Sequence, residues 1–540
     1  MSGGEPRRAR WLALGLFVTA IALYANTLGH GYVYDDQIIA KSPLADRPFA
    51  LGEIFSNAFY GDASSDLALY RPLTDWSYLL THAADRALDP SGASHFVAHA
   101  TNVLLHALAT VLFFAWMRRI GAALLPAALA ALLFAAMPVH VESVANVTGR
   151  SDVLAACFVL GAFLAHASRA WLAAPPLFLC ALWSKESVLL LPLVPLLCDA
   201  WIARSPAGAR VRRLAGYAVV VVLWIPLWRA AMSGPHIGPQ PIENPLVQLD
   251  HADRVLNALA IQVDYLARML WPAHLSTDYS LAQIPLVASV FTLRVVLALL
   301  LAAAAVLGLV VLRTRVPRAA VAIAGYGLAF AITSNLALPI GTIMAERLAY
   351  MPSLFLCLLL AAPLEWARLP RSVAQAWAIV LVAGAVAHGA RTVVQNRVWK
   401  DELTLFTEQV ATAPNSAKAH FNLGAVLALA GKLDLAVAHY DRSIAIFPRY
   451  GHVWYCRGNA LYRRRAPDAE VAPNYVEALK WAPRHHDARA NLALTLLRMG
   501  QADEAREHFE RLRSESPAHP SVAAIRERLE HLQRDQGGPR

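Results

Sequence analysis

The stretch VFTLRVVLALLLAAAAVLGLVVL at residues 290–312 decides the class of this chain, since it holds a single charged residue, Arg294. A helix that crosses a bilayer needs about 20 mostly apolar residues, so this stretch predicts a membrane span. The composition agrees, because 57% of the 540 residues are hydrophobic, 16% are charged, and the mean hydropathy is +0.42. Soluble chains carry about 45–50% apolar and about 25% charged residues, so we expect an integral membrane protein.

Similar apolar runs occur on both sides of this stretch and predict about eleven spans in total. The runs are residues 11–29, 96–117, 121–138, 151–168, 170–184, 187–202, 214–232, 290–312, 319–338, 349–366 and 373–390. Arginine clusters flank them, and short loops rich in arginine stay cytoplasmic. With eleven spans every cluster falls on that side. We therefore expect a cytoplasmic N-terminus and two long extracytoplasmic loops, at about residues 30–95 and 233–289.

Beyond residue 400 the sequence repeats itself. Pro414, Pro448, Pro483 and Pro517 follow one another at intervals of 34, 35 and 34 residues, which is the period of tetratricopeptide (TPR) repeats. The period predicts about three helix pairs, near residues 414–448, 448–483 and 483–517, that bury their apolar faces by stacking on one another.

The two patterns together define the predicted fold class, which is all-α. A polytopic membrane helix bundle occupies residues 1–395, and a TPR α-solenoid occupies residues 396–540. The solenoid is expected on the extracytoplasmic side, because an odd number of spans precedes it.

Charged residues gather where the apolar runs end on the predicted outer side. Asp35 and Asp36 follow the first run, and two adjacent carboxylates at a membrane boundary favour a cation, a proton or an acceptor hydroxyl between them. The other candidates at this edge are Arg71, His140, Glu142, Arg150, Asp152, Lys185, Glu186, Glu346 and Arg347. Their complementary charges suit a site that holds a phosphate group beside a carboxylate base, although each residue alone also fits a helix cap or an interfacial ion pair.

Several of these segments resemble transmembrane-and-TPR proteins of the protein O-mannosyltransferase type, in the C-type glycosyltransferase superfamily. The matching segments are Gly31 to Asp36, YRPLT at 70–74, NVLLHAL at 102–108, MPVHVESVANVTGRSD at 137–152, SKE at 184–186 and AERLAYMPS at 345–353. The resemblance covers nearly the whole chain. It implies an enzyme that passes a monosaccharide from a polyprenyl-phosphate donor to a protein or lipid-linked acceptor outside the cytoplasm.

The resemblance also implies roles for the candidates. Asp36, with Asp35 nearly as favoured, would orient or deprotonate the acceptor hydroxyl, and the pair would bind a divalent cation such as Mg²⁺ or Mn²⁺. Lys185 and Arg347 would bind the donor phosphate, because leaving-group charge needs fixed cations. The polar edge around them would comprise Arg71, His140, Glu142, Arg150, Asp152, Glu186 and Glu346.

Two other functional classes stay open. A membrane-anchored TPR adaptor would need no acid–base set, and a flippase for lipid-linked saccharides is expected to show inverted repeats, which the sequence lacks. We expect membrane lipid, the lipid donor, and an acceptor protein or peptide in the TPR groove as partners. Nucleic acid is not expected, since the basic residues behind the net charge of +10 lie mainly beside apolar runs and in the tail. Richness in Ala and Arg favours a bacterial inner membrane.

Overall fold

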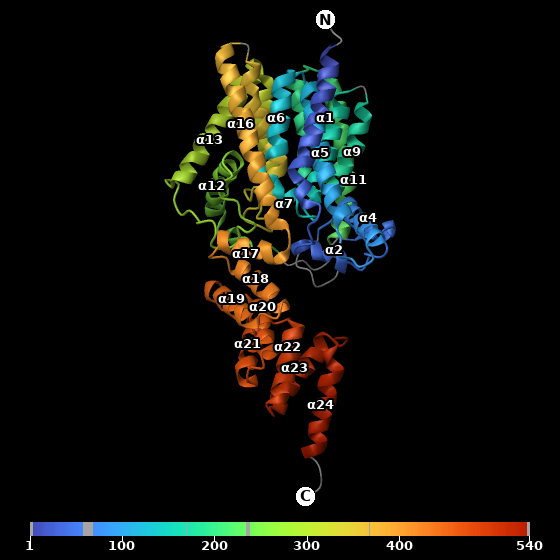
Figure 1. Cartoon of the computed structure of the whole chain (residues 1–540), viewed down its shortest axis with the longest axis vertical. Helices are drawn as coiled ribbons and strands as arrows, with labels where there is room; N and C mark the ends of the chain where they lie inside the picture. Colours follow the sequence, from blue (N-terminus) through green and yellow to red (C-terminus); the bar gives the residue numbers. More distant parts are fainter. Residues whose placement is uncertain (1–3, 58–68, 169, 234–237, 367, 537–540) are drawn as a thin grey trace. The chain divides into compact units, whose positions relative to one another are not determined.

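The computed structural model of the chain describes residues 4–57, 69–168, 170–233, 238–366 and 368–536, and every regular element in these ranges is helical (Figure 1). The chain forms two compact units. The first comprises Met1–Tyr279 and Pro285–Leu405, and the second comprises Ser280–Ile284 and Phe406–Arg540. The boundary predicted at residues 395/396 therefore falls inside the first unit.

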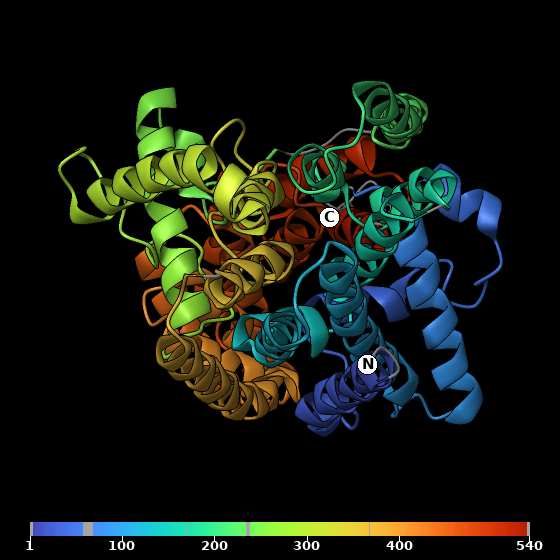
Figure 2. The ribbon, with the colours of Figure 1, turned by 90° about the horizontal axis from the view of Figure 1, so that it is seen from above.

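The first unit is a bundle whose long helices run alongside one another, and Figure 2 shows them nearly end-on. Its helices are α1 (Gly4–Tyr24), α2 (Gln37–Lys41), α3 (Leu51–Ser56), α4 (Pro72–Leu88), α5 (Phe96–Arg119), α6 (Leu124–Ala136), α7 (Val141–Val144), α8 (Arg150–His166), α9 (Ala174–Ser184), α10 (Leu193–Trp201), α11 (Ala207–Ala231), α12 (His251–Leu270), α13 (Leu293–Arg315), α14 (Pro317–Phe330), α15 (Tyr350–Ala361) and α16 (Arg371–Asn396). Apolar surroundings favour helices, because a helix satisfies its backbone N–H and C=O groups internally.

The number of spanning helices is lower than the sequence predicts. Six helices in the described ranges are long and apolar enough to cross a membrane, or seven if the bent pair Leu124–Ala136 and Pro138–Val144 is one span. The six are Glu5–Thr27, Phe96–Arg119, Ala207–Ala231, Leu293–Arg315, Glu346–Glu365 and Arg371–Trp399. The prediction of about eleven spans is not supported.

Four of the predicted runs account for most of this correction. They fold into α8, α9, α10 and α14, which have 17, 11, 9 and 14 residues. Turns and short 3₁₀ segments interrupt the apolar sequence between them. An apolar run indicates that a segment is buried away from water. It does not determine the length of the helix, because that also depends on where the backbone turns.

One end of the bundle, which we call the basic end, carries Arg118, Arg119, Arg213 and Arg318. The contacts that join its helices are Arg118–Glu5 at 2.6 Å, Arg119 to the carbonyl oxygen of Ala167 at 2.7 Å, Arg213–Asp199 at 2.6 Å, and Arg318–Glu365. The opposite end, which we call the polar end, holds α2, α4 and α7 at the bottom of the bundle in Figure 1.

The second unit consists of helix pairs in the predicted TPR order. After α17 (Glu402–Thr412), which spans the boundary between the units, come α18 (Ala417–Leu429), α19 (Leu433–Ile446), α20 (Gly451–Arg463), α21 (Asp468–Trp481), α22 (His486–Arg498), α23 (Ala502–Glu515) and α24 (Ser521–Gln536). Close packing within a pair depends on small residues. A Cβ atom on Gly424 would lie 2.7 Å from the ring of Tyr440, so only glycine fits there without displacement.

The turns inside the three helix pairs share one backbone conformation. Gly431 and Gly500 have φ angles of +76° and +77°, in the left-handed region that glycine adopts without strain. In the middle pair the corresponding residue is Arg465, with φ of +61°. Helix α21 begins three residues after Arg465, one residue later than its counterparts begin, which locates the insertion that lengthens the middle repeat.

Candidate active site

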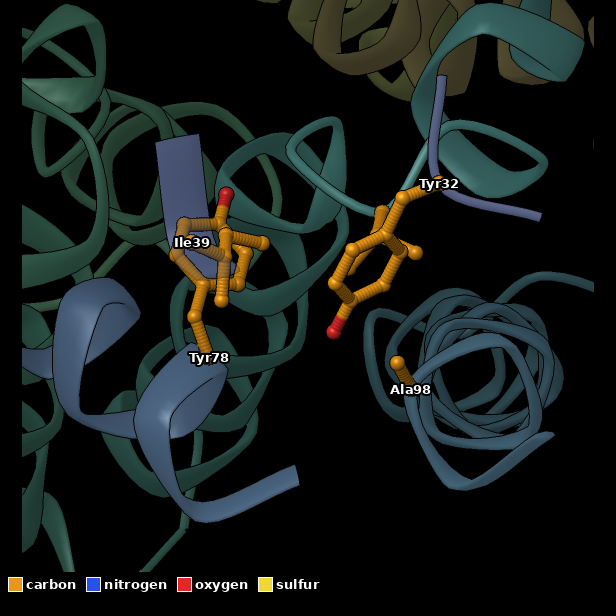
Figure 3. Packing of buried hydrophobic residues seen from close by; sticks show 5 residues of the cluster. Tyr32, Ile39, Tyr78 and Ala98 are labelled. Atoms are coloured by element: carbon orange, nitrogen blue, oxygen red, sulfur yellow. The ribbon is translucent and has the colours of Figure 1, made fainter. Parts of the chain in front are cut away.

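The acidic pair lies in a short 3₁₀ segment, η2 (Tyr34–Asp36), at the polar end of the first unit. Tyr34 has φ of +54°, a left-handed conformation that costs free energy in a residue with a side chain. Tyr32 and Ile39, which flank the segment in sequence, belong to a buried apolar cluster with Tyr78, Ala98 and Val147 (Figure 3). The packing of α2, α4 and α5 residues against this loop therefore holds a strained backbone in place.

Asp36 points into the protein. Its carboxylate accepts hydrogen bonds from the backbone N–H groups of Thr148 at 2.7 Å, Val147 at 3.2 Å and Val33 at 3.4 Å, and none of its surface is exposed. Burial raises the pKa of Asp36 to about 7, while the N–H donors act in the opposite direction. With both oxygens occupied and no access from outside, Asp36 ties η2 to residues 147–148.

Asp35 is placed differently, although it is the next residue in the chain. It is half-buried, and it interacts electrostatically with Arg347, which belongs to the 3₁₀ segment η7 (Glu346–Ala349). Successive residues of a tight turn point in different directions, so one aspartate faces the interior and the other faces the charged groups at the polar end. The structure thus brings Asp35 to these charged groups and keeps Asp36 away from them, whereas the sequence favours Asp36 over Asp35; which of the two reacts stays a prediction.

Three ion pairs lie at this end of the bundle, and one of them contains Arg347. Arg71 donates two hydrogen bonds to Glu186, at 2.6 and 2.8 Å, Lys185 lies 2.5 Å from Asp152, and Arg347 lies 2.5 Å from Glu142. Electrostatic interactions join the pairs, since Arg71 and Arg347 both act on Lys185 and Asp152 acts on Arg347. Six of the predicted site residues are thus brought together. We call these six, with Asp35, the polar cluster.

The helix ends explain how residues so distant in sequence meet. Arg71 precedes α4, Asp152 lies in the first turn of α8, Lys185 follows the last residue of α9, and Glu186 begins the next 3₁₀ segment. Because these helices all begin or end at the polar end, their terminal side chains converge. Thr74 fastens α4 to the end of α9 by donating to the carbonyl oxygen of Ser184 at 3.0 Å.

Burial strengthens the charge interactions in the polar cluster. Burial disfavours the ionised form of Glu186, but the charge and hydrogen bonds of Arg71 outweigh it and hold the pKa of Glu186 at about 2. Burial lowers the pKa of Lys185, whereas Asp152 acts in the opposite direction. The second carboxylate oxygen of Asp152, Oδ2, is buried and has no hydrogen-bond partner within the described ranges.

Three predicted residues lie apart from these pairs. Arg150 is fully buried and donates to Asn102, Ser77, Thr81 and the carbonyl oxygen of Ala98, so it joins α8 to α4 and α5. His140 bonds to Ser353 at 2.7 Å and packs on aromatic rings inside the bundle. Glu346 accepts from Tyr279 at 2.7 Å and from the N–H of Ser276 at 2.8 Å. Their contacts indicate roles in holding the scaffold.

The predicted divalent cation site was assigned to Asp35 and Asp36. Both oxygens of Asp36 accept backbone N–H groups, and an N–H donor and a metal ion exclude one another at the same lone pair. Among the residues that the structure describes, no group of three or more His, Cys, Asp or Glu side chains is placed to hold a metal ion. Of the pair, only Asp35 is placed among the charged groups of the polar end, and a Mg²⁺ or Mn²⁺ site there stays a prediction.

Two buried polar residues near the polar cluster were not singled out from the sequence. Asn102 donates to the carbonyl oxygen of Asn146 at 2.9 Å and accepts from Arg150 at 2.7 Å, so it holds the loop that Asp36 also binds. Asp75 is buried with its Oδ1 unpartnered in the described part of the chain, and burial raises the pKa of its carboxyl. Asn102 is a polar residue in the mostly apolar segment NVLLHAL, and Asp75 ends the segment YRPLTD. A polar side chain in such a segment is the sequence signal that could have identified both residues.

Comparison with known proteins adds two family matches. Residues 237–306 match the profile of the family described as protein O-mannosyl-transferase TMTC, DUF1736. Residues 463–529 match the tetratricopeptide repeat. The chain carries a TPR repeat. This match covers α21, the third helix pair and part of α24.

Curated relatives extend the similarity over most of the chain. A protein O-mannosyl-transferase of Caenorhabditis elegans is 27% identical over 81% of this chain and 62% of its own length. The human protein O-mannosyl-transferase TMTC1 is 28% identical over 79% of this chain and 54% of its own length, and Drosophila melanogaster Tmtc2 is 32% identical over 51% and 31%. This chain thus spans about a third to three-fifths of these relatives. They are animal proteins, so a bacterial source stays a prediction.

Proposed function

We propose that this chain is a membrane glycosyltransferase that transfers a mannosyl group from a polyprenyl-phosphate donor to a hydroxyl group of an acceptor protein. The observation that carries the proposal is the polar cluster, which gathers three cations and four carboxylates where buried helices end. Ionisable groups at membrane depth are costly and are usually kept for function. The sugar and the class of acceptor come from the relatives, which are named protein O-mannosyl-transferases.

In the proposed reaction, Asp35 accepts the proton of the acceptor hydroxyl as its oxygen attacks the anomeric carbon of the sugar. The bond between that carbon and the phosphate oxygen breaks, and the electron pair leaves with the polyprenyl phosphate. Arg71, Lys185 and Arg347 would stabilise the negative charge that develops on the leaving phosphate. Each cation would exchange part of its contact with a carboxylate for contact with a phosphate oxygen.

The unpartnered oxygen of Asp152 suggests how the sugar is oriented. A carboxylate oxygen that is buried without a donor is energetically costly. A sugar hydroxyl of the donor would satisfy Oδ2, while Lys185 on Oδ1 keeps the carboxylate charged. The same carboxylate would thus bind the sugar, and its lysine partner would bind the phosphate beside it.

We infer that the polar end faces the extracytoplasmic side, because Arg118, Arg119, Arg213 and Arg318 lie beside the short connections at the opposite end, and short loops rich in arginine stay cytoplasmic. The end of the bundle at which each loop lies decides this orientation, whatever the number of spans. The end of α16 lies at the polar end, since Asn396 donates to the carbonyl oxygen of Leu23 at 2.9 Å and the carbonyl oxygen of Lys400 accepts from Gly31. We propose that the TPR unit, which follows α16 in the sequence, is extracytoplasmic and binds the acceptor protein.

Transfer of labelled mannose tests the proposal directly. Purified full-length protein is incubated with mannosyl phosphoryl polyprenol and an extracytoplasmic protein that offers Ser and Thr hydroxyls. We expect labelled acceptor from the wild type, formed about 10²- to 10⁴-fold more slowly by Asp35→Asn. Absence of transfer from the wild type, with this donor and with donors that carry other sugars, would remove the proposal.

A second candidate function is a membrane-anchored TPR adaptor without catalysis. The observation that favours it is that Arg71, Lys185 and Arg347 each already bind a carboxylate, so phosphate must compete for them. An adaptor requires the TPR unit and the bundle but is indifferent to the charge of Asp35. Complementation of a deletion strain by Asp35→Asn, at wild-type protein level, would favour the adaptor.

A further inference from the structure

A groove at the basic end has no role in the proposed reaction. It lies between α10, α11, α13 and α14 and has a volume of about 850 Å³. Its walls are almost wholly apolar, and the residues that matter below are Leu193, Leu214, Val306, Gly327 and Arg210. The polar cluster is at the other end of the bundle, so the groove is distinct from the candidate active site.

The groove opens on a surface that the bilayer covers. Helices α11 and α13 are both candidate spans, and only 17% and 11% of their most apolar windows are buried within the protein. Leu214 and Val306 in the walls are 45% and 62% exposed. In water such surface would be unfavourable, whereas in a bilayer it contacts hydrocarbon. A lipid chain is therefore the natural occupant of the apolar part.

The depth of the groove corresponds to one leaflet. Helix α14 contributes residues as far as Leu328, and from Pro317 at the basic end to Leu328 the helix extends about 16 Å. Half of a hydrocarbon core of about 30 Å is about 15 Å. An acyl chain that enters from the basic end would thus reach the inner limit of the groove near the middle of the bilayer.

Arg210 supplies a charge at the mouth of the groove. It lies in the first turn of α11, and its Nε atom is buried without a hydrogen-bond partner among the described residues. A neighbouring arginine, Arg213, is already paired with Asp199 at 2.6 Å. Arg210 therefore offers an unsatisfied cationic donor next to an apolar chain-sized groove.

We propose that this groove binds an anionic phospholipid of the leaflet at the basic end, with its acyl chain between α10, α11, α13 and α14 and its phosphate at Arg210. Basic residues between membrane helices recognise anionic headgroups, and the apolar walls supply the chain contact. A second groove at the same end repeats the combination. It has a volume of about 440 Å³, is lined by Phe114 and Leu164, and has Arg10, Arg118 and Arg119 among its lining residues.

The test uses full-length protein reconstituted in vesicles of equimolar phosphatidylglycerol and phosphatidylcholine, released in mild detergent and examined by native mass spectrometry. The wild type is expected to retain phosphatidylglycerol in preference to phosphatidylcholine. Arg210→Gln should lower that preference about fivefold, the effect of removing one arginine from a lipid headgroup. Arg212→Gln is the matched control, since it removes the same charge from the same helix and Arg212 is not among the lining residues.

A second variant tests the apolar part. A Cβ atom added at Gly327 has no atom within 4 Å, so Gly327→Leu extends a side chain into the groove from a position with room for it. It should lose one retained lipid of either kind while Arg210 stays in place. Equal lipid preference in Arg210→Gln and Arg212→Gln would overturn the proposal. Retention of phosphatidylglycerol by Gly327→Leu at the wild-type level would also overturn it, because a site for phosphate alone does not need the groove.

Discussion

Lys185 and Asp152 at the polar end are 2.5 Å apart, and Arg118 and Glu5 at the basic end are 2.6 Å apart, so the two ion pairs have nearly the same length. Their surroundings differ. The side chains of the first pair are 6% and 7% exposed, and those of the second are 28% and 62% exposed. Solvent screens the second pair, whereas the first depends on its partner for the stabilisation that water no longer gives.

This difference separates two uses of charge in one bundle. Exposed arginines at the basic end cost little and bias the orientation of the chain in the membrane. Buried pairs at the polar end carry a desolvation penalty, so stability alone does not explain them. A site that binds a charged phosphate does explain them, because it needs cations that are already desolvated and oriented.

The largest expected effect concerns the side of the membrane that each end of the bundle faces. A fused reporter enzyme should be either active or inactive, depending on that side. Alkaline phosphatase fused after Ser91 or Pro448 should be active, because these positions follow the polar end, whereas fusions after Arg119 or Arg213 should be inactive. Activity is measured in cells at matched fusion levels. An inactive fusion at Pro448 would place the TPR unit and the polar end in the cytoplasm and would reverse the comparison.

The next effect distinguishes the two adjacent aspartates at the polar end. Asp35→Asn should lower the rate of sugar transfer by about 10²- to 10⁴-fold, the usual cost of losing a general base, and leave the thermal unfolding of the protein unchanged. Asp36→Asn should instead lower the yield of folded protein, since an amide NH₂ group would face a backbone N–H donor. Wild-type turnover in Asp35→Asn would leave the polar cluster without its proposed base.

Removal of one partner from the buried ion pair of Lys185 and Asp152 should show how much free energy it costs to bury the other charge unpaired. Lys185→Met leaves Asp152 charged and buried, so we expect a loss of about 3–5 kcal/mol in the free energy of unfolding, measured by denaturant titration in detergent. The double variant Lys185→Met/Asp152→Leu should recover part of that loss, because it removes the uncompensated charge. If Lys185→Met lowers the free energy of unfolding by less than the breaking of an exposed ion pair does, water reaches the polar cluster.

An intermediate case lies at the basic end itself. Asp199 is 7% exposed and bonds to both Arg213 at 2.6 Å and His166 at 2.9 Å. Arg213→Met removes one of two partners, so we expect a loss of about 1.5–3 kcal/mol in the free energy of unfolding. This variant distinguishes whether the burial of an ion pair or its position in the bundle determines the free energy of unfolding that is lost when the pair is broken. A negligible loss here would make position the deciding factor.

The smallest effect belongs to the exposed pair. Glu5→Gln should change the free energy of unfolding by less than about 1 kcal/mol, and added salt should reduce the change further. The measurement is the same denaturant titration at low and high ionic strength. A loss as large as that of Lys185→Met would remove the distinction between the two ends.

The sequence predicted the repeat unit more fully than the bundle. The period of the four prolines located the three helix pairs, because each TPR repeat is stabilised by its own residues and its neighbours. Apolar runs located the membrane helices but not their ends. The segments at 151–168 and 187–202 became helices of 17 and 9 residues, since turns inside the bundle are set by contacts that no local pattern records.

For the candidate site, the sequence alone determined which residue types gather at the ends of apolar runs, because charge is excluded from hydrocarbon and must lie where a run stops. Only the tertiary structure decided their partners. It pairs Arg71 with Glu186 and Arg347 with Glu142, over separations of 115 and 205 residues, and it buries Asp36 while leaving Asp35 half-exposed. The physical reason is that desolvation and hydrogen bonding depend on which helix ends meet, and that is a property of the packed bundle.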